Sequence, residues 1–231
     1  MLNSEINITR FSAWAPGINS SDEWYEWAAG KREIESSGKS PDIAFTDPIF
    51  RRRLSQISKM TIQVVHDILP VEEGTKLFFI SFRGELARQY QTNRMLIEEN
   101  SLMPAAFSLS VFNAPAALAT MAFGLKGGYC ATYPGNGSFT AGLAAAEAAL
   151  LYGDGKEIVF IYADEEVLEN YREVCGEYSP PLAFALLLSK DPCSTTDKPD
   201  RVLLSSLKEA VDNPHGFLKQ LLAIGEIHAP G

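Results

Sequence analysis

The segment FSLSVFNAPAALATMAFGLKGGYCATYPGNGSFTAGLAAAEAALLYGDGKEIVFIYAD, residues 107–164, decides the fold of this chain. Its spacing of apolar and small residues predicts two helices and two strands, over 114–124, 129–133, 138–152 and 158–162. The turn PGNGS (134–138) joins the first strand to the second helix. In α/β proteins, a turn of this kind presents a helix N-terminus to a ligand or to a nucleophile.

The helix predicted over 138–152 consists almost entirely of small and apolar residues, and Glu147 is its only charged residue. A helix that is apolar on nearly every side is typical of a helix buried among several neighbours. We therefore expect this helix to be packed on several sides. A sharper hypothesis is that its N-terminus, at residues 136–139, faces an active-site cavity.

The rest of the chain continues the alternation of strands and helices. Further strands are predicted over 6–14, 76–82 and 182–189, and further helices over 20–29, 47–68, 85–100 and 217–224. In the helix over 85–100, the side chains expected to point inward are Leu86, Tyr90, Met95 and Leu96. This pattern predicts an α/β fold with a mixed, mainly parallel sheet that is covered by helices on both faces.

The composition limits the classes of partner. The 231 residues are 46% hydrophobic and have a formal net charge of −9, which disfavours nucleic acid and anionic membranes as partners. No apolar run approaches the ~20 residues of a membrane helix, and the first residues lack the pattern of a signal peptide. The cysteines, Cys130, Cys175 and Cys193, are scattered. We therefore expect a cytoplasmic protein with reduced thiols and without membrane insertion.

The glycine-rich turn does not complete a known cofactor or hydrolase motif. Residues 135–140 approximate GxGxxG, but Thr140 replaces the third glycine and no acidic residue follows at the expected spacing of ~20 residues. The GxSxG pattern of hydrolases also fails, since Asn136 and Thr140 stand where it requires glycine. No Cys/His spacing matches a zinc site. We expect neither a cofactor nor a metal.

The end of the second helix resembles a known family. Leu151-Tyr152-Gly153-Asp154 is similar to the Tyr-Gly-Asp turn that follows the nucleophile helix of the β-ketoacyl synthases, which belong to the thiolase-like superfamily. Counting back along the helix places the family's cysteine nucleophile at or next to Asn136, where this sequence has no cysteine. Three further segments resemble the chain length factors of bacterial aryl polyene biosynthesis, at 11–17, 51–55 and 107–113.

The resemblance covers roughly residues 5–190 and implies a thiolase-like half-fold in a single domain, 1–231. Residues 1–190 would correspond to the N-terminal half of a ketosynthase, and 191–231 would form a linker and a C-terminal helical tail. The resemblance covers no part of the half that supplies the catalytic histidines of the family. The implied role is that of a non-catalytic chain length factor that pairs with a full-length ketosynthase and bounds its acyl tunnel, in polyene or fatty-acid-like biosynthesis. An acyl carrier protein is implied as a transient partner.

The same resemblance suggests site residues. The candidates for lining the tunnel are Leu86, Tyr90, Phe107 and Phe112. The candidates for the dimer interface form the strand that pairs across the dimer axis in ketosynthases, which here comprises Gly128, Tyr129, Cys130, Ala131, Thr132 and Tyr133. The first turns of a predicted helix contain three consecutive arginines, Arg51, Arg52 and Arg53. Their side chains form either a solvated face or a contact for the acidic carrier protein.

Two other functional hypotheses remain open. The first is that the chain is a free-standing acyl-transferring enzyme that uses Cys130 or Ser138 as its nucleophile. The second is that it is a homodimeric scaffold without a ketosynthase partner. Cys130 lies inside a predicted strand and away from a helix N-terminus, so we expect it to be buried and unreactive.

Overall fold

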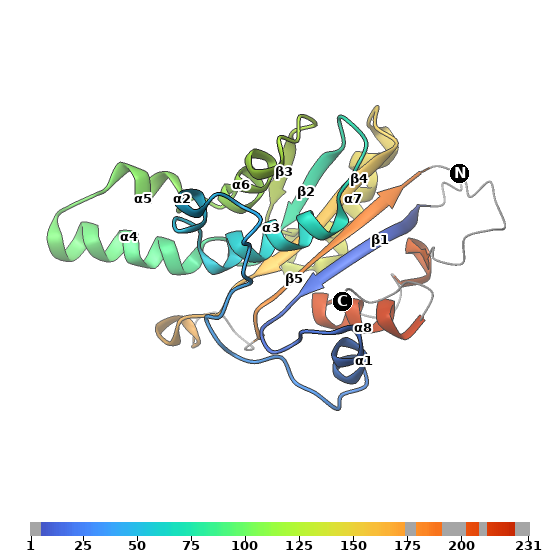
Figure 1. Cartoon of the computed structure of the whole chain (residues 1–231), viewed down its shortest axis with the longest axis horizontal. Helices are drawn as coiled ribbons and strands as arrows, with labels where there is room; N and C mark the ends of the chain where they lie inside the picture. Colours follow the sequence, from blue (N-terminus) through green and yellow to red (C-terminus); the bar gives the residue numbers. More distant parts are fainter. Residues whose placement is uncertain (1–5, 174–178, 191–201, 208–211, 225–231) are drawn as a thin grey trace.

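The computed structural model describes residues 6–173, 179–190, 202–207 and 212–224, and its centre is a six-stranded sheet (Figure 1). The strands lie in the order β3-β2-β4-β5-β1-β6. Their bounds are β1 Asn7–Trp14, β2 Lys76–Ile80, β3 Tyr129–Thr132, β4 Glu157–Asp164, β5 Leu182–Ser189 and β6 Val202–Leu203. β3 therefore forms one edge of the sheet.

The sheet is mixed, as expected, but it is not mainly parallel. β2 is parallel to β3 and β4, whereas the pairs β4–β5, β5–β1 and β1–β6 are antiparallel. The expectation is wrong in this respect because a parallel neighbour requires a long crossover, usually through an α-helix. The described part of the connection between β4 and β5 contains only the short 3-10 helix η2, Glu169–Tyr171.

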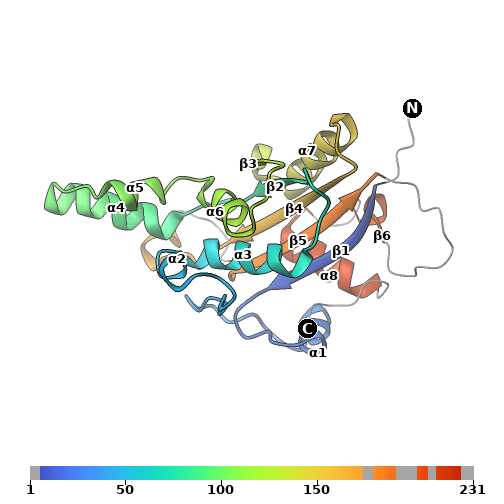
Figure 2. The same cartoon turned by 45° about the horizontal axis from the view of Figure 1, so that its top comes forward.

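Helices cover both faces of the sheet, as the sequence predicts (Figure 2). One face packs against α1 (Ser21–Ala28), α7 (Phe139–Tyr152) and α8 (Pro214–Ile224), and the other against α3 (Gln56–Ile68) and α6 (Ala114–Phe123). Successive strand residues alternate between these two cores, as the pleat requires. Among the described residues, no helix combines the length and the apolar character that a membrane crossing requires.

Phe139, the first residue of α7, lies at the centre of the larger core. Its ring centroid is 6.0 Å from those of Phe160, Tyr162 and Phe184, which belong to two neighbouring strands, and 5.2 Å from that of Phe217. Phe217 belongs to α8, so the C-terminal helix contributes directly to the main core.

The helix expected over 47–68 is two helices. Asp47 caps α2 (Pro48–Arg51) by accepting hydrogen bonds from the backbone N–H groups of Ile49 and Phe50, and the chain then turns. Ser55 caps α3 by accepting from the N–H of Ser58 at 3.2 Å. The helical spacing of apolar residues correctly predicted a helix in the region of α3. It did not reveal that a second N-cap residue, Ser55, interrupts the predicted helix.

The expectation that α7 is buried on several sides is wrong for this chain. The buried residues of α7 are Phe139, Gly142, Leu143, Ala146 and Leu150. The exposed ones are Ala141, Ala144, Ala145, Ala148, Ala149 and Tyr152. The sheet covers one side of the helix, and no described element of the chain covers the other.

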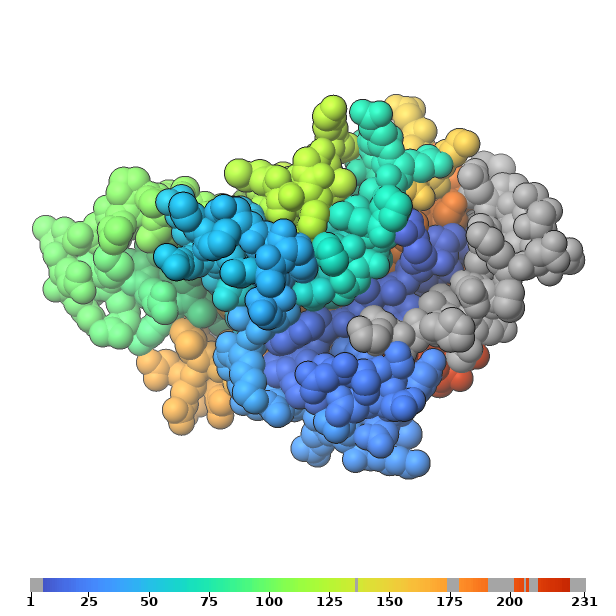
Figure 3. Space-filling view, in the orientation of Figure 1, coloured from blue at the N-terminus to red at the C-terminus, as the bar shows by residue number. Residues whose placement is uncertain are grey.

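Helices α4 (Leu86–Glu99) and α5 (Pro104–Ser108) form an arm that projects beyond the sheet (Figures 1 and 3). Thr92 is the only residue of α4 classed as buried. Leu86, Tyr90 and Met95 are half-buried, whereas Leu96, which we expected to point inward, is 49% exposed. That expectation is wrong because most of α4 extends away from the sheet instead of lying on it.

We predict that Phe139→Ala destabilises the fold by about 3–5 kcal/mol, because it opens a cavity among aromatic rings from three other elements. Chemical denaturation followed by circular dichroism measures this loss. Tyr152→Ala is the matched control on the same helix, because Tyr152 is 89% exposed, and it should change the free energy of unfolding by less than about 0.5 kcal/mol. Equal losses in the two variants would contradict the central position of Phe139.

Candidate functional site

The turn before α7 is a short 3-10 helix, η1 (Gly135–Gly137), that leads into the N-cap residue Ser138. Gly137 has a φ of +70°, a conformation that favours glycine. The Ser138 hydroxyl accepts a hydrogen bond from the backbone N–H of Ala141 at 3.2 Å. Asn136 belongs to this turn, and its side chain lies outside the described part of the structure.

A carboxylate from the C-terminal region occupies the N-terminus of α7. Asp212 Oδ1 accepts hydrogen bonds from the Ser138 hydroxyl at 2.9 Å, the Thr140 N–H at 2.8 Å and the Thr140 hydroxyl at 2.9 Å. The Thr140 N–H bond, with help from the other donors, lowers the pKa of Asp212. A carboxylate of lowered pKa is a weak base, so this arrangement caps the helix and does not activate Ser138. The sequence did not reveal Asp212, because it lies 72 residues away from Thr140.

A cleft of about 360 Å³ opens at the carboxyl ends of β2, β3 and β4, beside this turn. Its lining includes Arg83, Tyr133, Asp164 and Asp212. Asp164 is buried and accepts hydrogen bonds from the Ser81 hydroxyl at 2.6 Å, the Arg83 N–H at 3.0 Å and the Tyr162 hydroxyl at 2.9 Å. Burial raises its pKa, although Arg83 and these donors oppose the shift. The carboxylate holds the turn after β2 in place.

The strand expected at the dimer interface is an exposed edge. Within the described part of the chain, β3 pairs only with β2, and Tyr129 and Tyr133 expose much of their side chains. Cys130 is a free, exposed thiol, so our expectation that it is buried is wrong. A strand pattern does not distinguish a central strand from an edge strand, and only the strand order settles the exposure of Cys130.

Phe107 and Phe112 line one cavity, of about 400 Å³, between α4 and the segment that follows α5. We call it the aromatic groove; it is lined by Gln89, Thr92, Asn93, Phe107, Ser110, Val111 and Phe112. Phe107 is 53% exposed, whereas Phe112 packs edge-on against Phe79 with 6.2 Å between ring centroids.

Leu86 and Tyr90, the other two tunnel candidates, do not line the aromatic groove. The Tyr90 hydroxyl accepts a hydrogen bond from Asn170 Nδ2 at 2.9 Å, and its ring meets that of Tyr171 edge-on at 5.6 Å. Tyr90 therefore faces η2, whereas Leu86 is half-buried in the first turn of α4.

A larger groove of about 660 Å³ lies between the arm, α2 with the turn that follows it, and α6. We call it the arginine groove, because Arg52, Arg53 and Arg88 line it together with apolar residues that include Leu54, Met95, Leu109 and Leu118. Arg51 does not line it, and its guanidinium donates to the Ile43 carbonyl at 3.2 Å. The three consecutive arginines thus do not form one surface, and they lie at the break between α2 and α3 instead of in the first turns of a long helix.

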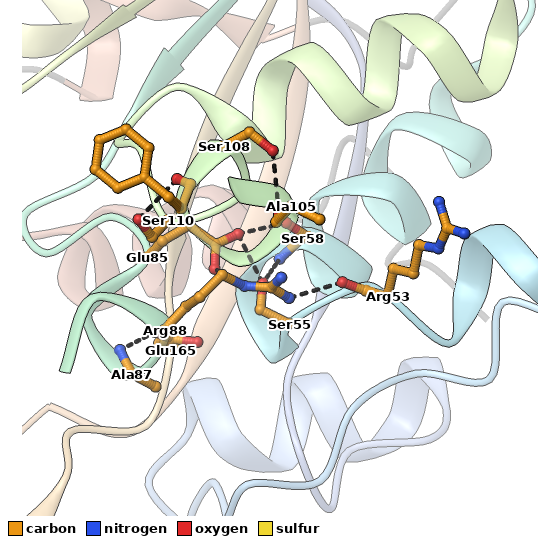
Figure 4. Close-up of polar contacts among 11 residues, drawn as sticks. Arg53, Ser55, Ser58, Glu85, Ala87, Arg88, Ala105, Ser108, Ser110 and Glu165 are labelled. Carbon is orange, nitrogen blue, oxygen red and sulfur yellow. Dashed lines mark hydrogen bonds and ion pairs between the residues drawn. The ribbon is translucent and has the colours of Figure 1, made fainter. Parts of the chain in front are cut away.

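The base of the arm contains a buried carboxylate, Glu85, which is fully inaccessible to solvent (Figure 4). Its Oε1 accepts hydrogen bonds from the Ser55 hydroxyl at 2.7 Å and the Ser58 hydroxyl at 2.6 Å. Arg88 Nε lies 3.4 Å from Oε2. Burial raises the pKa of Glu85 above its ordinary value, and the two serines and Arg88 oppose this shift.

A second buried carboxylate, Glu165, lies at the same base (Figure 4). Its Oε1 accepts a hydrogen bond from the Ala87 N–H at 2.9 Å, in the first turn of α4. Burial is the main reason that its pKa rises to about 7. The charges of Glu85 and Asp164 add to the rise, and the N–H groups of Ala87 and Ile57 oppose it. In the sequence, Glu165 only marks the start of an acidic loop. The one available signal was that two acids directly follow a buried strand.

In the part of the chain that the structure describes, no three His, Cys, Asp or Glu side chains are grouped in a way that could hold a metal ion.

Comparison with known proteins identifies relatives by family and by fold. The chain matches the family described as β-ketoacyl synthase, N-terminal domain, over residues 24–227. It is similar in structure to a chain in a complex of a ketosynthase with its chain length factor from Xenorhabdus doucetiae. The TM-score is 0.76 and the identity 24%, over 94% of this chain and 91% of the other. No curated protein matches the chain.

Two further solved structures share the fold. The ishigamide ketosynthase/chain length factor matches with a TM-score of 0.66 and 12% identity, over 96% of this chain and 82% of the other. A type II polyketide synthase acyl-carrier protein in complex with its hexaketide-bound ketosynthase matches with a TM-score of 0.58 and 13% identity, over 80% of this chain and 63% of the other. The six-stranded α/β architecture is thus that of the N-terminal half of a ketosynthase.

We predict that Glu165→Gln removes a pH dependence of stability between about pH 5 and 8. The folded pKa, about 7, lies above the ordinary value of 4.5, so the native state binds more protons than the unfolded state in this window. Protonation of Glu165 therefore stabilises the folded state. Its contribution to the free energy of unfolding is fully present below the unfolded pKa and is lost as the pH rises through 7. The two pKa values differ by the equivalent of roughly 3 kcal/mol.

Urea unfolding of wild type and Glu165→Gln at a series of pH values measures this effect as the difference between the two curves. Glu98→Gln is the control on the same arm, because Glu98 is exposed and paired with Arg94 at 2.8 Å. A wild type that gains stability relative to Glu165→Gln as the pH rises would show that the sign is wrong.

Proposed function

Because the chain belongs to the β-ketoacyl synthase family, as a member of its N-terminal domain group, we propose that it is a chain length factor. In this role it pairs with a full-length ketosynthase and bounds the acyl tunnel of that partner, without a condensation activity of its own. The observation that supports this most directly is a ketosynthase half-fold whose nucleophile turn has no cysteine and whose helix N-terminus is capped by Asp212. Two of the similar solved structures are complexes that contain a chain length factor.

The chemistry of the turn supports a non-catalytic role. A thioester-forming nucleophile needs an activated thiolate or hydroxyl and a site that stabilises negative charge. Here the positive end of α7 is already neutralised by Asp212, and the Ser138 hydroxyl donates to the same carboxylate. Cys130 lies four residues or more before η1 and α7 on an edge strand, outside the reach of a helix N-terminus.

The exposed surface supports pairing through β3 and the arm. Large exposed apolar side chains gather on β3, its flanking residue, the arm and α6: Leu96, Ile97, Leu102, Met103, Phe107, Met121, Tyr129 and Tyr133. Exposed apolar patches mark interaction surfaces, and an unpaired edge strand offers backbone groups to a second strand. We propose that Gly128, Tyr129, Cys130, Ala131, Thr132 and Tyr133 form the pairing strand.

The aromatic groove is the part of this surface that we propose to bound the tunnel. Phe107 and Phe112 present rings to the same cavity, next to α4. Leu86 and Tyr90 are weaker candidates, since Tyr90 is engaged by Asn170 and Tyr171. We also propose that an acyl carrier protein, which is acidic in this family, docks transiently, with Arg52 and Arg53 of the arginine groove as cationic contacts.

We predict that Cys130→Arg abolishes co-purification with a co-expressed full-length ketosynthase partner and leaves the isolated chain folded. The side chain is exposed, so a charge is tolerated by the free chain but is desolvated without a partner charge at an interface. Tyr25→Arg on α1, at the opposite end of the molecule from β3, is the control and should co-purify normally (Figure 1). Normal co-purification of the Cys130→Arg variant would exclude pairing through β3.

We predict that Phe107→Ala shifts the products of the reconstituted complex towards one or two more extension cycles. Removing the ring leaves space for a few methylene groups, and each buried methylene stabilises a longer chain by about 0.8 kcal/mol. Phe112→Ala should act in the same direction, at a greater cost in stability, because its ring also packs on Phe79. Product mass is the readout, and Glu169→Ala is the surface control. If both aromatic variants lower total product without lengthening it, the gating role is wrong.

A further inference from the structure

We propose that Glu85 and Glu165 are positioning residues for the arm: the two buried carboxylates hold the N-terminal end of α4 against the body, and a change in their protonation changes the direction in which α4 leaves the body. This positioning role concerns the geometry of the arm within the chain. Any effect of the arm on product length rests on the proposed function.

The arm has few other anchors. Thr92 is the only α4 residue classed as buried, and Ile97, near the C-terminal end of α4, is 80% exposed. The described polar contacts between α4 and the body lie in its first two turns. They are the contacts of Glu85 and Glu165, the bond from Arg88 to the Arg53 carbonyl at 2.7 Å and the bond between Asn170 and Tyr90. The orientation of the whole arm is therefore set at its base.

Each carboxylate joins elements that are far apart in the sequence. Glu85, the N-cap residue of α4, accepts from Ser55 and Ser58, and Ser55 is the N-cap residue of α3. Glu165 follows β4 and accepts from the Ala87 N–H in α4. The two carboxylates thus hold the N-terminal ends of α3 and α4 against the carboxyl end of β4 (Figure 4). Negative charge is favourable there, because helix N-termini carry partial positive charge.

The charges around the two carboxylates favour protonation of one of them. The carboxylates at this base are Glu85, Glu165 and Asp164, and the cations facing them are Arg88 at Glu85 and Arg83 at Asp164. One oxygen of Glu85, Oε2, has no hydrogen-bond partner among the described residues, apart from the ion pair with Arg88. Two like charges in one buried site repel, so protonation of either Glu85 or Glu165 relieves the repulsion.

The base of the arm is packed tightly against the aromatic groove. Gly84 precedes Glu85, and a Cβ added to it would lie 2.7 Å from Cδ2 of Phe112. A displacement of the turn before α4 therefore acts directly on a ring that lines the groove. Since α4 has 14 residues and is about 21 Å long, a rotation of a few degrees at its base moves its far end by on the order of 1–2 Å.

The test is a pulsed electron–electron distance measurement between spin labels on the full-length chain. The labels are attached to Ile97→Cys on the arm and Tyr152→Cys at the end of α7, in a background where Cys130, Cys175 and Cys193 are replaced by Ser. Samples of otherwise wild-type chain, Glu165→Gln, Glu85→Gln and the arm-surface control Glu98→Gln are compared at pH 5.5 and 8.5.

We expect the distance distribution of the wild type and of Glu98→Gln to shift on the order of 1–2 Å, or to broaden, as the pH is raised. Glu165→Gln should keep the low-pH distribution at both pH values, because the amide resembles the protonated acid. Glu85→Gln should show a smaller pH response than the wild type. A role that is only structural would alter stability in the variants but give no pH response in the folded wild type. If the wild-type distribution is the same at both pH values, the proposal is overturned, even if a variant fails to fold.

Product length in the reconstituted complex separates this proposal from the proposed function. If the distances respond to pH but Phe107→Ala and Phe112→Ala leave product length unchanged, the positioning role stands and the chain length role fails. If the aromatic variants lengthen the product while the distances do not respond, the positioning role fails.

Discussion

The central strands of this chain are apolar on both faces, and covering both of them is the constraint on which the rest of the structure depends. Nearly every side chain of β4 and β5 is buried, so helices must pack on each side of the sheet. Helices α3 and α6 cover one face, and α1, α7 and α8 cover the other. Once these helices are in place, apolar side chains stay exposed on the edge strand β3, the outer side of α7, the arm and α6. β3 and the arm are the parts of this surface for which we propose a partner.

A second theme is electrostatic. Carboxylates lie at the N-termini of three helices: Asp212 at α7, Glu85 at α4 and Glu165 between α3 and α4. At α7, the carboxylate accepts hydrogen bonds from the N-terminal end of the helix, which favours a structural role for this turn. At the base of the arm, burial of two carboxylates with few cations creates a site whose charge depends on pH, in direct contact with the helix that lines both grooves.

The candidate site was only partly predictable. Phe107 and Phe112 are five residues apart and line one groove, as a local segment allows. The resemblance suggested Leu86 and Tyr90 as tunnel residues, and the helical pattern predicted that they point inward. Tyr90 instead contacts η2, because helical periodicity does not determine the angle at which the arm leaves the sheet. Asp212 and Glu165 were not recognised, since their partners lie 72 and 78 residues away. Cys130 was expected to be buried, because the residue pattern of a strand does not show whether the strand lies at the edge of a sheet.

By itself, the sequence determined the elements that depend on neighbouring residues. These are the two small-residue helices and the turn between 107 and 164, the apolar strands, and the absence of a cysteine from the turn before the second helix. Only the tertiary structure decided the antiparallel position of β5, the exposed side of α7 and the electrostatic influence of Glu85 on Glu165. The physical reason is range: capping, periodicity and turn chemistry act over a few residues, whereas burial and electrostatic coupling depend on which distant segments are brought together.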